Sequence, residues 1–182
     1  DSRLVVHVRA LAPVAGGPQG AWKKSLKLFQ SGQPAKTLLQ DDAKLVTLAR
    51  DPTGSQWASL HQEQPHIRIW DQNGELVRVI QAPRQDSHPT GLALGPGNLI
   101  LVAEHQIVPG SSGSDYFNQG APAWLQLWDG SQEPAVLLDE VQVSTSPTSI
   151  RCAFSADGRW AATTAQDGED VRLFALLDPQ GA

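Results

Sequence analysis

A chain of 182 residues, of which 40% are hydrophobic, is long enough to bury the core of one domain. The charged fraction of 18% lies below the usual value of about 25%, and together with 16 glycines and 13 prolines it favours short strands and tight turns over a helix bundle or a disordered tail. A net charge of −5 argues against nucleic-acid binding, no run approaches the roughly 18 apolar residues of a membrane span, and no segment has the pattern of a signal peptide.

The first expected strand, residues 4–8, has the pattern of the second strand of a repeat rather than of its first strand. It resembles residues 159–163, which follow a turn in the last repeat. The innermost strand of the first repeat is therefore expected to be absent. The chain contains no methionine, so we expect residue 1 to follow a removed segment or to lie inside a longer chain. An insertion is expected over residues 9–22.

A strand that alternates apolar and non-apolar residues and ends in an aromatic residue then recurs along the chain. Such alternation is typical of a half-buried β-strand. The aromatic residues are separated by steps of 41, 58 and 46 residues, close to the period of about 40 to 50 residues shown by propeller blades. The strands are residues 25–29, 67–70, 125–128 and 171–174, which end at Phe29, Trp70, Trp128 and Phe174.

Further apolar strands flank each of these strands, and turn residues join them. Asn73-Gly74 is among the strongest hairpin signals, because both positions of the turn favour positive φ. The turns over residues 51–54, 95–98 and 155–158 combine Pro, Asp, Asn and Gly in the same way. Four antiparallel strands per repeat predict an all-β fold, the β-propeller with four-stranded blades. The flanking strands are expected at residues 36–39, 45–49, 56–60, 76–80, 91–94, 99–103, 135–138, 150–154 and 159–163.

The repeats predict one propeller segment over residues 1–182, with two complete and two partial blades. An open arc exposes sheet faces and strand edges, so we expect something to complete it. We favour further chain of a longer propeller, because the start falls inside a repeat. A second copy of the chain, or two ends that share one blade in a small ring, are the alternatives. The blade parts are expected at residues 1–40, 41–82, 87–141 and 147–182.

The step of 58 residues contains a second insertion, over residues 105–122. It is rich in Gly, Ser and Pro and lacks periodicity, which predicts a loop between two strands of the third blade. Loops on a rigid scaffold often carry binding residues, and aromatic residues are enriched at interfaces. The candidate interaction surface therefore comprises Tyr116 and Phe117 in this loop, with Trp22 and Trp124 beside the two insertions.

Several motifs resemble those of known propeller repeats. The strands that end in Trp70-Asp71 and Trp128-Asp129 resemble the WD signature of WD40 repeats, and residues 154–160 are similar to the turn between the first two strands of such repeats. Residues 89–103 look more like an NHL repeat. The Gly-His dipeptide of WD40 repeats is missing. The resemblance is to WD40- or NHL-like propeller proteins and implies the blade unit.

Structural roles are expected for the repeat positions themselves. A turn aspartate accepts backbone N–H groups, and strand tryptophans pack between blades. Cys152, the only cysteine, excludes a disulfide within the chain and is interpreted as a small buried residue. The structural repeat positions are Trp57, Trp70, Asp71, Trp128, Asp129 and Trp160.

No catalytic, cofactor-binding or metal-binding residues are predicted, and no cofactor. The five histidines lack metal-ligand spacing, no Gly-x-Ser-x-Gly elbow occurs, and residues 110–114 lack the features of a phosphate loop. We therefore expect a non-enzymatic protein-interaction or assembly scaffold with a protein partner. The alternative is a metal-dependent, lactonase-like hydrolase or small-ligand-binding propeller, whose candidate residues are Glu104, His105 and Asp115. The compartment is left open.

Overall fold

The computed structural model describes eight segments of the chain: residues 3–12, 21–40, 45–61, 66–81, 87–106, 122–144, 150–164 and 171–176. All of the strands within them belong to antiparallel sheets whose order follows the chain. None of the described helices is long and apolar enough to cross a membrane.

The first sheet has three strands and the second has four. In the second sheet the turn between the first two strands carries Asp51 and Gly54, and the turn between the last two carries Asp71 and Gly74. Both glycines have positive φ, of 75°, which a tight reversal requires. The strands of the first sheet are β1 (Arg3–Ala12), β2 (Ala21–Gln30) and β3 (Lys36–Gln40), and those of the second are β4 (Leu45–Arg50), β5 (Gln56–His61), β6 (His66–Asp71) and β7 (Leu76–Gln81).

The third sheet has four strands and the fourth has three. A short 3₁₀ turn, η1 (Pro96–Asn98), joins the first two strands of the third sheet. The strands of the third sheet are β8 (Ser87–Leu94), β9 (Leu99–Gln106), β10 (Ala123–Asp129) and β11 (Val136–Ser144), and those of the fourth are β12 (Arg151–Phe154), β13 (Trp160–Thr164) and β14 (Val171–Ala175).

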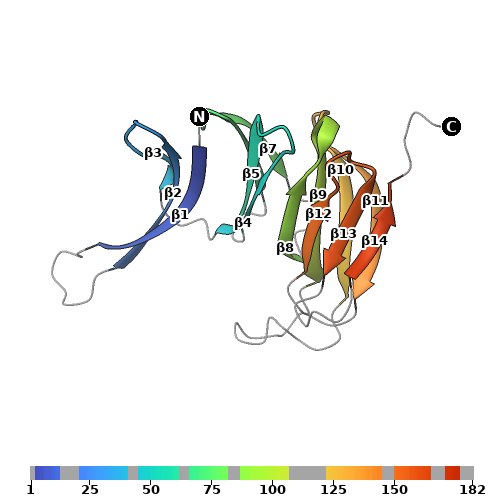
Figure 1. Cartoon of the computed structure of the whole chain (residues 1–182). Helices are drawn as coiled ribbons and strands as arrows, with labels where there is room; N and C mark the ends of the chain where they lie inside the picture. Colours follow the sequence, from blue (N-terminus) through green and yellow to red (C-terminus); the bar gives the residue numbers. More distant parts are fainter. Residues whose placement is uncertain are drawn as a thin grey trace.

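The four sheets stand side by side in chain order (Figure 1). Each neighbouring pair of sheets encloses a cluster of apolar side chains. Alternate strand residues face opposite neighbours, so both faces of the second and third sheets are covered. Ala58, Leu60, Ile67 and Ile69 face the third sheet, whereas Trp57 and Trp70 face the first. The core is therefore a series of layers between sheets.

The first strands of the last three sheets lie next to one another, with β4 against β8 and β8 against β12. Gly91 of β8 permits this approach. A Cβ atom at Gly91 would lie 2.6 Å from the backbone oxygen of Ile150, just before β12. Any side chain there would force the two sheets apart.

This arrangement is that of a β-propeller with two complete and two partial blades, which confirms the fold predicted from the repeats. The second and third sheets are the complete blades. In strand pairing the first sheet corresponds to the last three strands of a blade, and the fourth sheet to the first three. The extent of the domain over residues 1–182 and the bounds of its blade parts stay predictions.

Candidate interaction surfaces

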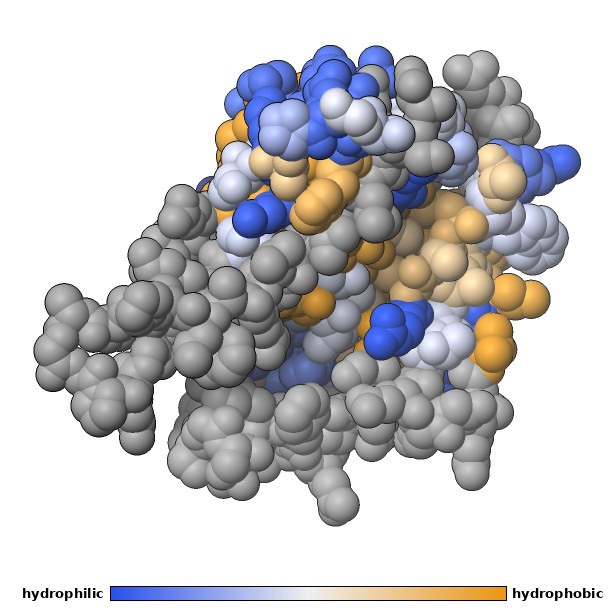
Figure 2. Space-filling model, turned by 60° about the vertical axis from the view of Figure 1, so that its left-hand side comes forward, coloured by the Kyte–Doolittle hydropathy of each residue, from blue (hydrophilic) through white to orange (hydrophobic). Residues whose placement is uncertain are grey.

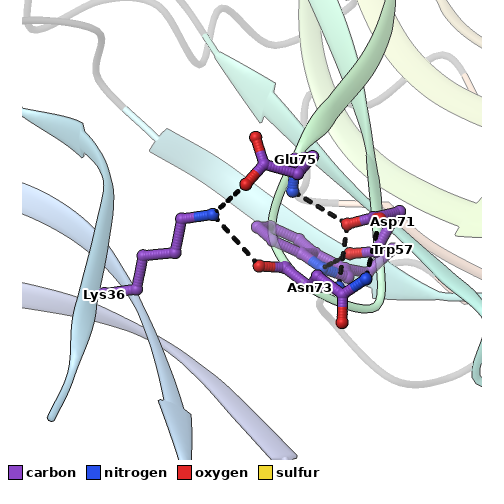
Figure 3. A network of polar contacts seen from close by, with 5 residues as sticks. All are labelled: Lys36, Trp57, Asp71, Asn73 and Glu75. Atoms are coloured by element: carbon purple, nitrogen blue, oxygen red, sulfur yellow. Dashed lines mark hydrogen bonds and ion pairs between the residues drawn. The ribbon is translucent and has the colours of Figure 1, made fainter.

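The turn after β6 is organised by the carboxylate of Asp71. Its Oδ1 accepts hydrogen bonds from the backbone N–H groups of Asn73 and Glu75, both at 2.8 Å (Figure 3). The backbone oxygen of Asp71 accepts a third from Trp57 Nε1 at 2.9 Å. The hydrogen bond from the Glu75 backbone is the largest of several that hold the pKa of Asp71 below its usual value. The carboxylate of this Trp-Asp pair thus closes a hairpin.

A lysine of the first sheet contacts the same turn. Lys36 Nζ of β3 forms an ion pair with Glu75 and donates to the backbone oxygen of Asn73 at 3.2 Å (Figure 3). Both charged side chains are largely exposed, so this link contributes little to stability. It joins the first blade to the second at their outer strands.

Three other aspartates accept backbone N–H groups in three other turns; Asp51 stands first in its turn as Asp71 does, whereas in the turn after β12 Ser155 has the first place and Asp157 the third. Asp51 accepts from Gln56 N at 2.7 Å, Asp129 from Ser131 N at 2.8 Å and Asp157 from Arg159 N at 3.1 Å. Hydrogen bonds lower the pKa of each carboxyl group. The largest contribution comes from Ser131 at Asp129 and from Ser155 at Asp157. At Asp51 burial raises the pKa, but several hydrogen bonds together lower it by more. Asp129 and Asp51 therefore hold their turns from the first position, as Asp71 does, and Asp157 holds its turn from the third; sequence reasoning had not singled out Asp51 or Asp157 as carboxylate sites.

The tryptophans of the second sheet form one buried stack. Trp57 and Trp70 lie with ring centroids 5.2 Å apart and planes inclined by 8°, against Leu26 of the first sheet. Trp70 Nε1 donates to Ser59 Oγ at 3.0 Å, and Ser59 Oγ lies 2.9 Å from His61 Nε2. Both rings are buried, and the N–H group of each ring has a hydrogen-bond acceptor.

The remaining aromatic residues of the sequence prediction are not gathered at one place. Trp128 is partly buried against the core between the second and third sheets, and Trp124 lies on β10 opposite Glu104. Trp160 is 49% exposed on β13. Trp22 pairs with Leu11 in the backbone register of the first sheet. Tyr116 and Phe117 lie outside the described residues, and so the interaction role of this set stays a prediction.

Glu104 and His105, the candidates for a metal-dependent hydrolase, are both buried at the end of β9. Glu104 accepts from Ser87 Oγ at 2.6 Å and from Gln126 Nε2 at 2.9 Å. The His105 ring lies 5.9 Å from that of His88, and burial, followed by the charge of His88, lowers the pKa of His105. In the described part of the chain no group of three or more His, Cys, Asp or Glu side chains is placed to hold a metal. Asp115 lies outside it.

A polar network crosses the third sheet from Glu104. Gln126 Nε2 also donates to Glu140 Oε2 at 2.6 Å, and Gln126 Oε1 accepts from Trp128 Nε1 at 3.2 Å. The glutamine thereby joins carboxylates on β9 and β11 through β10. Sequence reasoning missed Gln126 and Glu140, because their positions become neighbours only through the register of three strands.

Large apolar side chains reach solvent on the outer strands β7 and β11, on the far face of the fourth sheet and at one position of β2. Figure 2 shows such apolar side chains at the surface among polar ones. Contiguous exposed apolar surface is typical of contact sites. The exposed residues are Phe29 on β2, Leu76, Val77 and Val79 on β7, Val136, Leu137, Leu138 and Val141 on β11, and Trp160, Val171 and Leu173 on the fourth sheet.

A cavity of about 220 Å³ lies between the second and third sheets, at the end where their first turns meet. Apolar side chains that include Ile69, Leu94 and Ile100 line its floor, and the turns of Asp51 and Asn98 form two of its walls. Arg78 of β7 lines it as well, and donates from Nη2 to Asn98 Oδ1 at 3.2 Å. Sequence reasoning missed this cavity, because its walls come from two different blades.

No protein-family model and no curated protein matches the chain. Solved structures do resemble it. One is a chain in a crystal structure of the mitotic checkpoint complex, with a TM-score of 0.60 and 11% sequence identity. The alignment covers 94% of this chain and 44% of that chain, so this chain spans less than half the length of the neighbour. At this identity the likeness shows the fold alone.

Proposed function

We propose that the chain is a non-enzymatic protein-interaction or assembly scaffold of the β-propeller type. The observation that carries this proposal is the apolar surface left exposed on β7, on β11 and on the fourth sheet. Side chains such as Leu138 and Leu173, 51% and 67% exposed, gain free energy when a partner covers them. The likeness to a chain of a multi-protein complex is in keeping with it.

Completion of the propeller belongs to the same proposal. The register places Leu173 opposite Ala162 and Val171 opposite Thr164, so these exposed residues share the face of the fourth sheet that points away from the third. In an interior blade the corresponding face is covered by the next sheet. We propose that a further blade, from more of the same polypeptide or from a second copy, covers this face.

The insertion between β9 and β10 is the second contact surface of the proposal. Its two ends are held together, because Gln106 N donates to Pro122 O at 3.1 Å. Residues 107–121 can therefore be replaced by a short Asn-Gly turn without stretching either strand. Tyr116 and Phe117, within this segment, are the proposed contact residues.

The test is capture of partners by the tagged chain from the cells that express it, followed by mass spectrometry. The variant with residues 107–121 replaced should keep its far-ultraviolet circular dichroism and its melting temperature, yet lose specific partners. The double variant Tyr116→Ala, Phe117→Ala should lose the same partners with the full-length segment in place. The matched control, Asn118→Ala with Gln119→Ala, should keep them.

Two results would contradict the proposal. One is an unchanged set of captured proteins after replacement of the segment and after introduction of a charge at Leu173. The other is a chain that captures no protein above the background of an unrelated propeller. A thermal shift produced by Ca²⁺ or Zn²⁺ together with hydrolytic activity would instead favour the metal-dependent alternative.

A further inference from the structure

Arg78 is partly buried and lines the cavity between the second and third sheets, where one of its donor atoms, Nε, is buried without an acceptor among the described residues. A guanidinium carries five N–H donors. In the described part of the chain its one side-chain acceptor is Asn98 Oδ1, and its buried Nε has no acceptor there. A buried cationic donor without an acceptor is costly, so the site favours an occupant that brings oxygen atoms.

The negative charges beside Arg78 do not meet this need. Asp51 lines the same cavity, but its carboxylate already accepts hydrogen bonds from Thr53, Ser55 and Gln56 within its own turn. Asp129 is near enough for the charge of Arg78 to contribute to its lowered pKa, but its oxygens accept from Ser131 and Gln132. The acceptor positions of Asp51 are thus filled within its own turn, and neither carboxylate forms a hydrogen bond or ion pair with Arg78 among the described residues.

The size of the cavity limits what can enter. Pockets for cofactors and drug-sized ligands usually measure about 300 to 1,000 Å³. The volume here, about 220 Å³, is smaller and suits one side chain. The floor of Ile69, Leu94 and Ile100 offers apolar contact to the carbon atoms of that side chain, while Arg78 faces its polar end.

We propose that this cavity, the Arg78 pocket, receives an aspartate or glutamate side chain from a partner protein. The carboxylate accepts hydrogen bonds from the free donors of Arg78, and its stem lies on the apolar floor. Thr53 and Ser55 line the same opening, and their hydroxyl oxygens, whose hydrogens go to Asp51, can accept a hydrogen bond from the backbone N–H beside that residue. This inference rests on the proposed scaffold function and specifies the chemistry of one contact.

The experiment is a titration of the full 182-residue chain, labelled with ¹⁵N, with short peptides followed by two-dimensional NMR. The probe is acetyl-Leu-Glu-Leu-amide. We expect saturable shifts of the Arg78 Nε–H resonance and of the Gly97 and Asn98 amides, with a millimolar dissociation constant. The Gln counterpart, acetyl-Leu-Gln-Leu-amide, should bind at least about tenfold more weakly, because a neutral amide forms weaker hydrogen bonds to a guanidinium than a carboxylate does.

Two further probes distinguish the source of the carboxylate from other anions. Acetyl-Leu-Gln-Leu with a free carboxyl terminus tests a chain end, and inorganic phosphate tests any compact anion. We expect both to bind more weakly than the glutamate peptide. Equal or tighter binding of either would overturn the assignment to an acidic side chain.

Variants locate the binding. Arg78→Gln should weaken binding of the glutamate peptide at least about tenfold, so that this peptide no longer binds more tightly than the Gln peptide. The control is Arg159→Gln, because Arg159 lies exposed in the turn between β12 and β13 and outside the cavity. Absence of saturable shifts up to about 20 mM peptide, or equal loss in both variants, would overturn the proposal. Such a failure would overturn the Arg78 pocket alone, because the proposed scaffold function is tested separately by partner capture through residues 107–121.

Discussion

The turn carboxylate of Asp71 predicts how stability responds to acid. Its pKa is lower in the folded chain than in the unfolded one, so the charged form stabilises the fold above the unfolded value of about 4. This stabilisation is lost as the pH falls toward the folded pKa. The effect is small because the carboxylate is exposed, but Asp51, Asp129 and Asp157 add to it in the same direction.

Asp71→Asn should therefore be less stable than the parent chain at pH 7, and the difference should shrink below about pH 4. Urea unfolding at a series of pH values measures this. Glu133→Gln, at an exposed position outside the Asp71 network, is the control and should behave as the parent chain does. If the difference in unfolding free energy between Asp71→Asn and the parent chain stays constant from pH 7 to about pH 3, the charged carboxylate of Asp71 does not stabilise the turn.

Cys152 should be chemically inert in the folded chain. Burial raises the pKa of its thiol to about 12, and Sγ lies 3.9 Å from the backbone oxygen of Leu101. The thiolate is the reactive form, so alkylation by iodoacetamide at pH 8 should run at least about 100-fold more slowly than in urea-unfolded chain. Native-state labelling at the unfolded rate would show that the thiol is not buried.

At the scale of elements, two turn glycines with the same backbone conformation allow the cost of backbone strain to be compared with the cost of a steric clash. Gly32 and Gly74 both have φ of 75°. A Cβ atom at Gly32 would meet nothing within 4 Å, whereas at Gly74 it would lie 2.4 Å from Leu38 Cδ2. Gly74 thus marks the close approach of the turn after β6 to the first sheet.

Gly32→Ala should cost about 1 kcal/mol of unfolding free energy, the strain of positive φ alone. Gly74→Ala should cost somewhat more, because the end of the Leu38 side chain must also move. Thermal and urea unfolding of both variants provide the comparison. Equal losses would mean that the first and second sheets do not pack in solution as described.

The same elements show what a sequence can predict. Gly74 and Gly97 supply the positive φ of their turns, and Asp51 closes its turn through its carboxylate, so the hairpins could be predicted from neighbouring residues alone. The expected positive φ at Asn73 is wrong, because only Gly74 of that pair has it. The link from Glu104 through Gln126 to Glu140 could not be predicted in this way, because it depends on cross-strand register. Arg78 and Asn98 belong to different sheets, and only the packing of those sheets brings them together.

For the whole molecule, the exposed face of the fourth sheet predicts association of the isolated chain. Leu173 and Val171 are 67% and 64% exposed beside Trp160, which is 49% exposed. We expect the apparent mass from light scattering to rise above 19.6 kDa as concentration increases. Leu173→Glu should lower this association, because a charge opposes burial of the face.

Gln33→Glu is the control, since Gln33 is exposed in the turn between β2 and β3 and lies outside the apolar surfaces. It should leave the concentration dependence of mass nearly unchanged. A chain that stays monomeric at all concentrations, with no binding of the hydrophobic dye ANS, would contradict the need for a covering partner.

The hydrogen bond between Gln106 and Pro122 has a consequence for how such a chain changes over evolutionary time. It holds together the two ends of the insertion between β9 and β10, and the sheet does not determine how long that insertion is. Closing a longer loop on such a base costs only about 0.6 kcal/mol for each doubling of its length. This position can thus accept new sequence, natural or grafted, and acquire a new specificity while the blade beneath it stays the same.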